Sequence, residues 1–387
     1  MFLFVVRRLL IAIPILILSS VLVFVLVANA GDPLEAVRGR PNSQQIVAQK
    51  TALYHLDQPA LQRYWTWATN FVHGDFGKDT NGQAVRPQLI RAMWITLRLV
   101  LAATIIAIVV GISVGVVSAV RQYSYFDYSS TFMAFLFFAM PVFWFAVLLK
   151  EFGAIKLNNW LQHPGISALG VILIVLFCAG LASVVFNLGE KRSRQRGLKA
   201  AVGGAAFGLV LTVILSTIFA HHSFTRWVST IGPQTPSFKG SFWAGLGDIG
   251  GHMILPTITL AIISFATYSR YQRASMLDTL SSDYVRTAKA KGLSNRRVIF
   301  KHAFRTALIP VVTLIAIDFG LLLGGAIITE TVFQWHGMGT LFYNAVLKDI
   351  DPNSAMAYLM VTATMVIVFN IIADIAYAYL DPRIRID

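Results

Sequence analysis

Long apolar stretches separated by charged segments dominate the pattern of this chain. They cover residues 9–28, 99–120, 129–149, 166–186, 200–220, 254–268, 306–329 and 354–380. A helix of about 20 apolar residues crosses the hydrocarbon core of a bilayer. The stretch 254–268 reaches this length only if it continues to residue 274, past Arg270 and Arg273, whose charged ends extend to the interface. The pattern therefore predicts an all-α, polytopic transmembrane bundle of about eight transmembrane helices.

Composition and charge agree with this class. Of the 387 residues, 56% are hydrophobic and only 13% are charged, whereas about a quarter of the residues in a soluble protein are charged. The formal net charge is +14. With the N-terminus in the cytoplasm, most of this excess falls in the inside segments, as the positive-inside rule requires. We therefore expect both termini to be cytoplasmic, and we attribute the basic charge to topology and membrane lipid rather than to nucleic acid.

The apolar stretches also predict the division of the chain. Ala28-Asn29-Ala30 resembles a signal-peptide cleavage site, but the apolar run before it exceeds the usual core of about 7–15 residues. The first helix is therefore expected to be uncleaved. The expected boundaries are residues 1–28 for this helix, 29–98 for an extracytoplasmic segment, 99–380 for the main transmembrane domain and 381–387 for a cytoplasmic tail. Within the domain, the Gly-, Pro- and Trp-rich residues 221–253 are expected to form a second outer cap.

No catalytic or cofactor-binding motif occurs in the sequence. The phosphate-binding pattern G-x-x-x-x-G-K-[ST], H-E-x-x-H and C-x-x-C are all absent. His221 and His222 are adjacent, so on a helix their side chains diverge by about 100° and do not chelate a metal as an i,i+4 pair does. We expect no enzyme activity, cofactor or metal site in this chain. Energy for uphill transport would come from another subunit or from an ion gradient.

Two acidic residues fall inside apolar stretches. Asp318 lies near the middle of the stretch 306–329, and Asp374 lies near the inner end of the last one. For neither residue does the sequence show an obvious intramembrane Lys, Arg or His partner. Asp318 either lines a water-filled path or pairs with another helix or subunit, while Asp374 is expected to be a packing or interface carboxylate. Five glycines permit a close approach of helix backbones: Gly111, Gly115, Gly320, Gly324 and Gly325. They indicate packing within the chain or, alternatively, a subunit contact, a gate or a place beside a pore.

The cytoplasmic segment 275–305 has the most informative local sequence. Ser281, Ser282 and an Asp favour a helix start, and Gly292 favours its end in the left-handed conformation. Ser294 favours a second helix over residues 295–308, ended or kinked around Pro310. The first helix would either lie on anionic headgroups or dock on a cytoplasmic motor. The residues assigned to docking are Asp283, Tyr284, Val285, Arg286, Thr287, Ala288, Lys289, Ala290, Lys291 and Gly292.

These residues also carry a family resemblance. The run from Arg286 to Gly292, followed by Leu308-Ile309-Pro310, is similar to the cytoplasmic EAA loop of ABC-importer permeases. More narrowly, the chain resembles the B-type permease subunit of dipeptide/oligopeptide (and nickel) importers. Other matching motifs, in chain order, are Gly31-Asp32-Pro33, Leu56-Asp57-Gln58-Pro59, Gly74-Asp75-Phe76-Gly77, Glu330-Thr331-Val332-Phe333 and Leu380-Asp381-Pro382-Arg383.

The resemblance implies a multi-pass permease of the bacterial plasma (inner) membrane that forms half of a pore for di- or oligopeptides. It also implies a second, C-type permease subunit, two cytoplasmic ABC ATPases that hold ATP and Mg, and an extracytoplasmic substrate-binding protein. In this scheme residues 282–291 would be the coupling helix that fits into a cleft of one ATPase. Residues 29–98 and 330–353 would touch the binding protein.

The chain departs from the family pattern in two places. The Glu and first Ala of the general motif are Arg286 and Thr287 here, as is familiar in the peptide branch. Residues 166–220 look like a two-helix hairpin inserted into a six-helix core. The alternative function is an ion-gradient-driven secondary transporter. That class favours paired intramembrane ionisable residues or an inverted repeat, and the sequence indicates neither.

Overall fold

The computed structural model describes residues 2–35, 38, 43–162, 165–187, 194–221 and 228–380. The described residues form two compact units, one from residues 1–148 and 231–387 and the other from residues 149–230. The helices are α1 (Phe2–Asn29), α2 (Ser43–Leu53), α3 (Ala60–Val72), α4 (Val85–Val120), α5 (Tyr125–Ala139), α6 (Val142–Lys150), η1 (Glu151–Lys156), α7 (Leu157–Gln162), α8 (Ala168–Asn187), α9 (Arg194–His221), α10 (Phe242–Leu280), α11 (Asp283–Ala290), α12 (Asn295–Arg297), η2 (Val298–Ala303), α13 (Phe304–Ala307), α14 (Ile309–Gly325), α15 (Ile327–Phe333), α16 (Met338–Tyr343), η3 (Asn344–Lys348) and α17 (Pro352–Leu380).

The predicted all-α membrane bundle is confirmed. Over the described ranges, five helices are long and apolar enough to cross a membrane, or up to seven when each of two bent helix pairs counts as one span. One bent pair joins α5 to the helical run Val142–Gln162, and the other joins the run Asn295–Ala307 to α14. The number of eight crossings and the cytoplasmic placement of both termini stay predictions.

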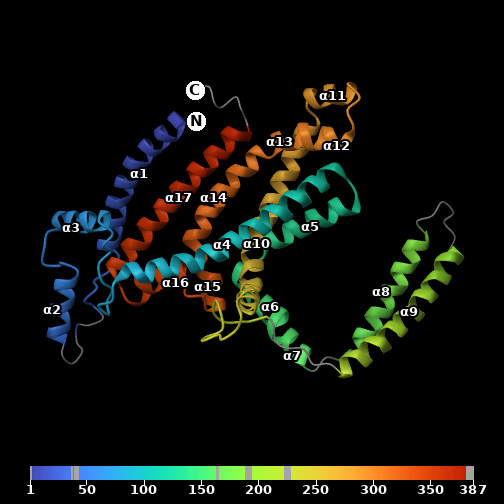
Figure 1. The fold of residues 1–387 in the computed structure, drawn as a ribbon, viewed down its shortest axis with the longest axis horizontal. Coiled ribbons are helices and arrows are strands. Elements are labelled where there is room, and N and C mark those ends of the chain that lie inside the picture. Colours follow the sequence, from blue (N-terminus) through green and yellow to red (C-terminus); the bar gives the residue numbers. More distant parts are fainter. Residues whose placement is uncertain are drawn as a thin grey trace. The chain divides into compact units, whose positions relative to one another are not determined.

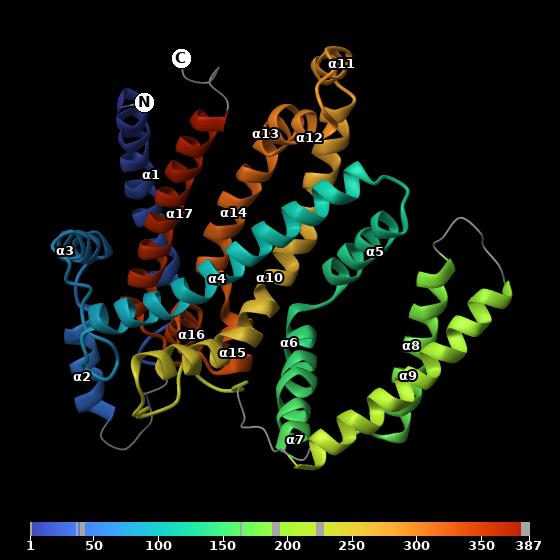
Figure 2. The ribbon, with the colours of Figure 1, turned by 45° about the vertical axis from the view of Figure 1, so that its right-hand side comes forward.

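The long helices α4 and α10 form the most extensive contact in the first unit, and they cross in both views (Figures 1 and 2). Two glycines of α4 make this contact close. A Cβ atom at Gly111 would lie 3.0 Å from the Cβ of Tyr268, and one at Gly115 would lie 2.7 Å from the carbonyl oxygen of Ser269. The predicted close packing at this small-residue motif is therefore confirmed.

Both helices extend beyond the apolar stretches that predicted them. Helix α4 begins at Val85 rather than near residue 99, because Val85 and Leu89 are buried in a cluster with Met338 and Tyr358. Helix α10 begins at Phe242, after Ser241 accepts a hydrogen bond from the Ala244 amide at 3.4 Å. Part of the expected outer cap is thus helical, since tertiary packing outweighs the low helix propensity of its glycines.

Helix α17 lies between α1 and α14 (Figures 1 and 2). Phe319 of α14 stacks near Phe369 of α17, with ring centroids 3.9 Å apart. The Arg8 guanidinium of α1 forms an ion pair with Asp374 of α17 at 3.1 Å. The start of α1, the last turns of α17 and helices α11–α13 lie at one end of this unit, while α15 and α16 lie at the other.

The second unit contains the predicted hairpin as two helices that lie side by side, α8 and α9. Glycines of α9 bring them into contact, because a Cβ atom at Gly208 would lie 2.9 Å from the Cα of Val175. At Gly204 an added Cβ would overlap the carbonyl oxygen of Cys178. In the same unit, the Asn158 side-chain amide donates to the Val228 carbonyl at 2.6 Å. The insertion of this hairpin into a six-helix core stays a prediction.

The contact at Gly115 predicts a specific loss of stability. Gly115→Ala places a methyl group against the backbone of α10, and such overpacking costs about 1–3 kcal/mol. We expect a lower midpoint of thermal unfolding for the purified, membrane-reconstituted chain. Gly250→Ala in α10 is the matched control, because an added Cβ there meets no atom within 4 Å. Equal midpoints for the two variants would contradict the close contact.

Candidate functional site

Helix α11 is attached to the bundle by one face. Val285 is fully buried and Ala288 is nearly so, and they belong to a cluster that includes Met276 of α10 and Val298 of η2. Residues three apart lie on the same side of a helix. The remaining docking residues predicted from sequence are exposed: Asp283, Tyr284, Arg286, Thr287, Lys289, Ala290, Lys291 and Gly292. The helix therefore presents a polar, mostly basic surface from an apolar base.

The end of α11 is fixed by backbone geometry. Gly292 has a φ of +76°, its amide donates to the Lys289 carbonyl at 2.9 Å, and the Leu293 amide donates to the Ala288 carbonyl at 3.4 Å. This is the Schellman arrangement, in which glycine takes the left-handed position. The predicted role of Gly292 as helix terminator is confirmed.

The predicted capping of these helices by serine side chains is wrong. Ser282 and Ser294 do occupy the N-cap positions of α11 and α12, but neither side chain accepts a capping hydrogen bond. The Ser282 hydroxyl donates instead to the Thr279 carbonyl at 2.6 Å. Since α10 ends directly before α11, the last carbonyls of α10 compete for this hydroxyl.

The segment after α11 adds a second basic surface. Helices α12, η2 and α13 run to Ala307 and meet α14 at a bend of 47°, close to Pro310. The predicted break around this proline is therefore confirmed. A shallow hollow on this segment is lined by Ser294, Arg296, Arg297, Phe300 and Lys301.

An ion pair that the sequence analysis missed links α5 to α10 near α11. The Arg273 guanidinium donates to both carboxylate oxygens of Asp127, at 2.6 and 2.8 Å. The Asp127 side chain is only 3% exposed and also accepts from the Ser118 hydroxyl of α4. Arg273 is thus fixed by a carboxylate rather than extended alone to the interface, as the sequence had suggested. Arg270 lies over the Phe138 ring, 4.1 Å from its centroid.

The two carboxylates of the apolar stretches both have partners. Asp318 accepts hydrogen bonds from Ser264 at 2.5 Å and from Tyr268 at 2.7 Å, both on α10. This geometry favours the helix-pairing interpretation over the water-filled path. Asp374 pairs with Arg8, a partner far away in sequence that the sequence did not make obvious.

Of the three predicted glycines in α14, Gly320 is the one whose surroundings the structure describes. A Cβ atom at Gly320 would lie 3.1 Å from the Val366 side chain of α17, which favours packing. Gly324 and Gly325 belong to α14, but their surroundings lie outside the described residues. A role of these glycines beside a pore stays a prediction.

A buried carboxylate organises the opposite end of the unit. Glu330 of α15 has no exposed surface. It accepts from the Thr96 hydroxyl of α4 at 2.6 Å and from the Thr340 amide of α16 at 2.8 Å. Gly337 is needed beside it, since a Cβ atom there would overlap the Thr96 hydroxyl. Burial raises the pKa of Glu330, and the hydrogen bonds from both threonines oppose this rise.

A second buried carboxylate, Asp351, lies just before α17. It accepts from the Ser354 hydroxyl at 2.6 Å and from the Tyr54 hydroxyl at 3.4 Å. Burial raises the pKa of both Asp351 and Tyr54. The tyrosine follows α2, so this contact ties the segment between α1 and α4 to the start of α17.

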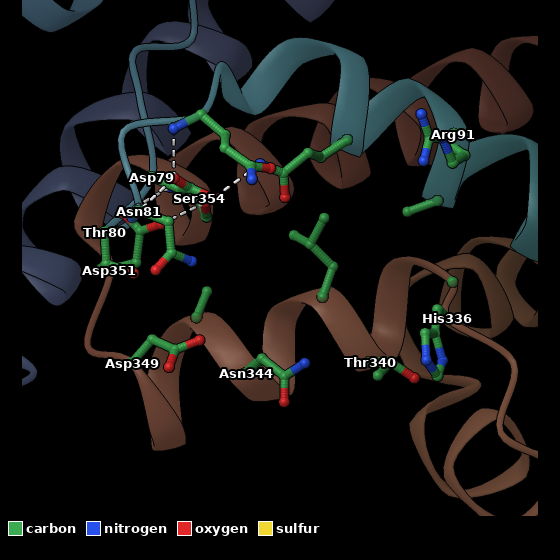
Figure 3. A pocket seen from close by; sticks show the side chains of 16 residues that line it. Asp79, Thr80, Asn81, Arg91, His336, Thr340, Asn344, Asp349, Asp351 and Ser354 are labelled. Carbon is green, nitrogen blue, oxygen red and sulfur yellow. Dashed lines mark hydrogen bonds between the residues drawn. The ribbon is translucent and has the colours of Figure 1, made fainter.

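A polar cavity of about 390 Å³ opens at this end of the unit. Its walls come from the turn before α4, from α4 itself and from the segment between α15 and α17 (Figure 3). Asp79, Asp349 and Asp351 lie at one end of it, and Arg91 and His336 lie at the other. The sequence analysis did not predict this cavity, because its walls are separated by more than two hundred residues. Its closest local indication was the polar, Gly- and Asp-rich run before α4.

Comparison with known proteins gives two family matches. Residues 1–105 match the N-terminal model of a membrane component of binding-protein-dependent transport systems. Residues 200–386 match the model described as the inner membrane component of binding-protein-dependent transport systems. Helix α11, the helices α14 to α17 and the cavity wall between α15 and α17 all fall within the latter match.

Curated relatives match along nearly the whole chain. The oligopeptide transport system permease protein OppB of Mycobacterium tuberculosis is 33% identical over 382 residues, covering 98% of each chain. The dipeptide transport system permease protein DppB of Escherichia coli is 34% identical over 385 residues, covering 99% of this chain and 98% of the relative. The oligopeptide permease AppB of Bacillus subtilis is 32% identical, covering 99% of each.

The raised pKa of Glu330 predicts a pH dependence of stability. A carboxyl whose pKa is raised by folding contributes stability below its unfolded pKa, and this contribution is lost as pH rises through the folded pKa. We expect the midpoint of thermal unfolding to fall as pH rises above the ordinary glutamate pKa of about 4.3. Glu330→Gln has no proton to lose, so its slope should be shallower, with the residual slope supplied by Asp351.

The exposed glutamate Glu35 provides the matched control for this measurement. Glu35→Gln should keep the slope of the parent chain. A Glu330→Gln variant with the parent's slope would show that this carboxyl does not change protonation on folding.

Proposed function

This chain belongs to the family of binding-protein-dependent transport system inner membrane components, and we propose that it forms half of the translocation pore of an ATP-driven importer of dipeptides or oligopeptides. It is a membrane permease subunit and not itself an enzyme. It is a multi-pass protein of the bacterial inner membrane. The peptide cargo is proposed from the relatives, which are named as dipeptide and oligopeptide permeases and match this chain over almost their full lengths.

The observation that carries the coupling mechanism is the one-sided attachment of α11. Its apolar base, Val285 and Ala288, holds the helix to α10 and η2, while Tyr284, Arg286 and Lys289 are exposed. Among the residues that the structure describes, Arg286 pairs only with Asp283 of the same exposed face, at 3.6 Å. A subunit that binds this surface differently in two states would bias the bundle between two conformations. The Asp127–Arg273 pair supports the transfer of force, because it ties α10 to α5 close to α11.

The partners complete this proposal. Two cytoplasmic ABC ATPases would hold ATP and Mg and would dock on residues 282–291. A second, C-type permease would form the other half of the pore, and an extracytoplasmic binding protein would deliver the peptide to residues 29–98 and 330–353. No cofactor in this chain is required by the scheme.

A gradient-driven carrier is the less favoured alternative. Asp318 is engaged by Ser264 and Tyr268, and Asp374 by Arg8. These contacts account for both carboxylates as links between helices, with no proton relay.

The coupling role predicts the effect of a single change at the end of α11. Gly292→Pro imposes a φ near −65° where the chain needs +76° and removes the amide that bonds to Lys289. Peptide uptake by membrane vesicles should be abolished, while the transmembrane bundle stays assembled. Deletion of residues 282–291 should act alike. Intact uptake in either variant would overturn the assignment of the coupling helix.

The exposed face of α11 can be tested without disturbing its fold. Lys289→Glu reverses a charge on the docking surface, and Lys199→Glu reverses one on another exposed lysine, in α9. We expect loss of ATP-driven uptake for the first and normal uptake for the second. Equal uptake by the two variants would indicate that α11 contacts lipid headgroups instead.

The partner set predicts the outcome of purification from the native membrane. The detergent-solubilised chain should carry with it a second permease and two ATPases that contain phosphate-binding loops, as identified by mass spectrometry. A chain that purifies alone and transports peptide in liposomes with only an ion gradient would contradict the proposal and favour the secondary transporter.

A further inference from the structure

The cavity in Figure 3 holds charges of both signs that do not neutralise each other. Its side chains include the carboxylates of Asp79, Asp349 and Asp351 and the bases Arg91 and His336. Across the described ranges, no ion pair joins an acid of this set to a base of this set. Their separation in Figure 3 explains this, because the acids and the bases occupy opposite ends.

Hydrogen bonds hold two of the three carboxylates at the acidic end of the cavity in place. Asp79 is 8% exposed and accepts from the Asn81 and Gln83 amides, at 2.9 and 2.8 Å, and from the Gln88 side chain at 2.8 Å. Asp351 is fixed by Ser354 and Tyr54, as described above. Asp349 is exposed, and over the described residues its carboxylate has no hydrogen-bond or ion-pair partner. A free carboxylate thus stands beside two that are held in place.

The basic end carries two unengaged side chains. Arg91 of α4 and His336 of the α15–α16 turn are both exposed, and no hydrogen bond or ion pair engages either side chain within the described ranges. His336 precedes Gly337, which is buried against Thr96 and Glu330. The position of the imidazole is therefore set by the buried Glu330 network, while the ring itself remains available.

This arrangement fits a zwitterion better than a metal ion. No group of three or more His, Cys, Asp or Glu residues in the described part of the chain is placed to hold a metal. The volume of about 390 Å³ falls within the range of small-molecule sites, about 300–1,000 Å³. Helices α16 and η3 separate His336 from Asp349 by about 15 Å, at a rise of about 1.5 Å per residue. An extended peptide of about four residues, each about 3.3–3.6 Å long, separates its ammonium and carboxylate by a similar distance. Asn344, between the two ends in Figure 3, offers an amide to a peptide backbone.

We propose that this cavity is a peptide-binding site of the chain, which takes a short peptide with free termini. Its ammonium group lies toward Asp349 and its carboxylate toward Arg91 and His336. The inference rests on the proposed function for its substrate class, and it adds a site in this chain that selects both termini. It places part of the specificity in the permease rather than in a soluble partner alone.

The test uses the single cysteine of the chain, Cys178, which lies in the other unit. With Cys178→Ala as background, Asn344→Cys places a reporter thiol in the cavity of the complete transporter in membrane vesicles. The rate at which a maleimide labels this chain is measured with tetraalanine, N-acetyl-tetraalanine or tetraalanine amide present. Tetraalanine should slow labelling, and each blocked peptide should need about tenfold higher concentration, since each loses one charged hydrogen-bonding end.

Two further substitutions identify which end recognises which terminus. Arg91→Gln should remove the difference between tetraalanine and its amide but keep the difference from N-acetyl-tetraalanine. Asp349→Asn should do the reverse. A general distortion of the cavity would weaken both differences together, so the crossed pattern is specific to the proposed orientation.

Control measurements distinguish failure of this binding site from failure of the proposed transport function. Lys239→Cys, exposed and outside the cavity, should label at the same rate with and without tetraalanine, and Asn81→Cys is a second reporter if Asn344→Cys does not assemble. Equal protection by all three peptides, or none by tetraalanine, would overturn the site. ATP-driven tetraalanine uptake by vesicles that carry only the Cys178→Ala background tests the proposed function separately, because labelling requires neither ATP nor the binding protein.

Discussion

The close approach of α4 and α10 is the constraint on which the first unit depends. Between helices in lipid there is no hydrophobic driving force, so association relies on packing and polar contacts. Gly111 and Gly115 let the backbone of α10 approach α4, and this fixes which face of α10 meets its other neighbours. Ser264 and Tyr268 then reach Asp318 of α14, and Met276 forms the base on which α11 rests.

The same two helices also connect the ends of the unit. Helix α4 carries Thr96, which bonds to Glu330 near the polar cavity, and Ser118, which bonds to Asp127 near α11. Helix α10 carries Arg273, the other partner of Asp127. Because both helices are continuous and tightly packed, a displacement at α11 acts on a rigid pair rather than on a flexible chain. The architecture therefore provides a physical link between α11 and the polar cavity.

Much of this could be predicted from sequence where the determinant is local. Apolar runs of membrane-spanning length gave the helical class, and Gly292, Pro310 and the Gly111–Gly115 spacing gave a helix end, a bend and a close contact. Helix boundaries were less predictable. Helix α4 begins at Val85 because its first turn is buried against α16 and α17, and hydropathy within the segment carries no information about that contact.

The polar contacts could not be predicted for a different reason. Asp127 and Arg273 are 146 positions apart, and Thr96 and Glu330 are 234 apart, so their pairing depends on which helix faces meet. A charge in an apolar stretch indicates that a partner exists, because burial without one is costly. It does not indicate the partner, as Arg8 and Asp374 illustrate. Where charges of both signs share one cavity and remain apart, as at Arg91 and Asp349, the same reasoning points outside the chain, toward a ligand that carries both complementary charges.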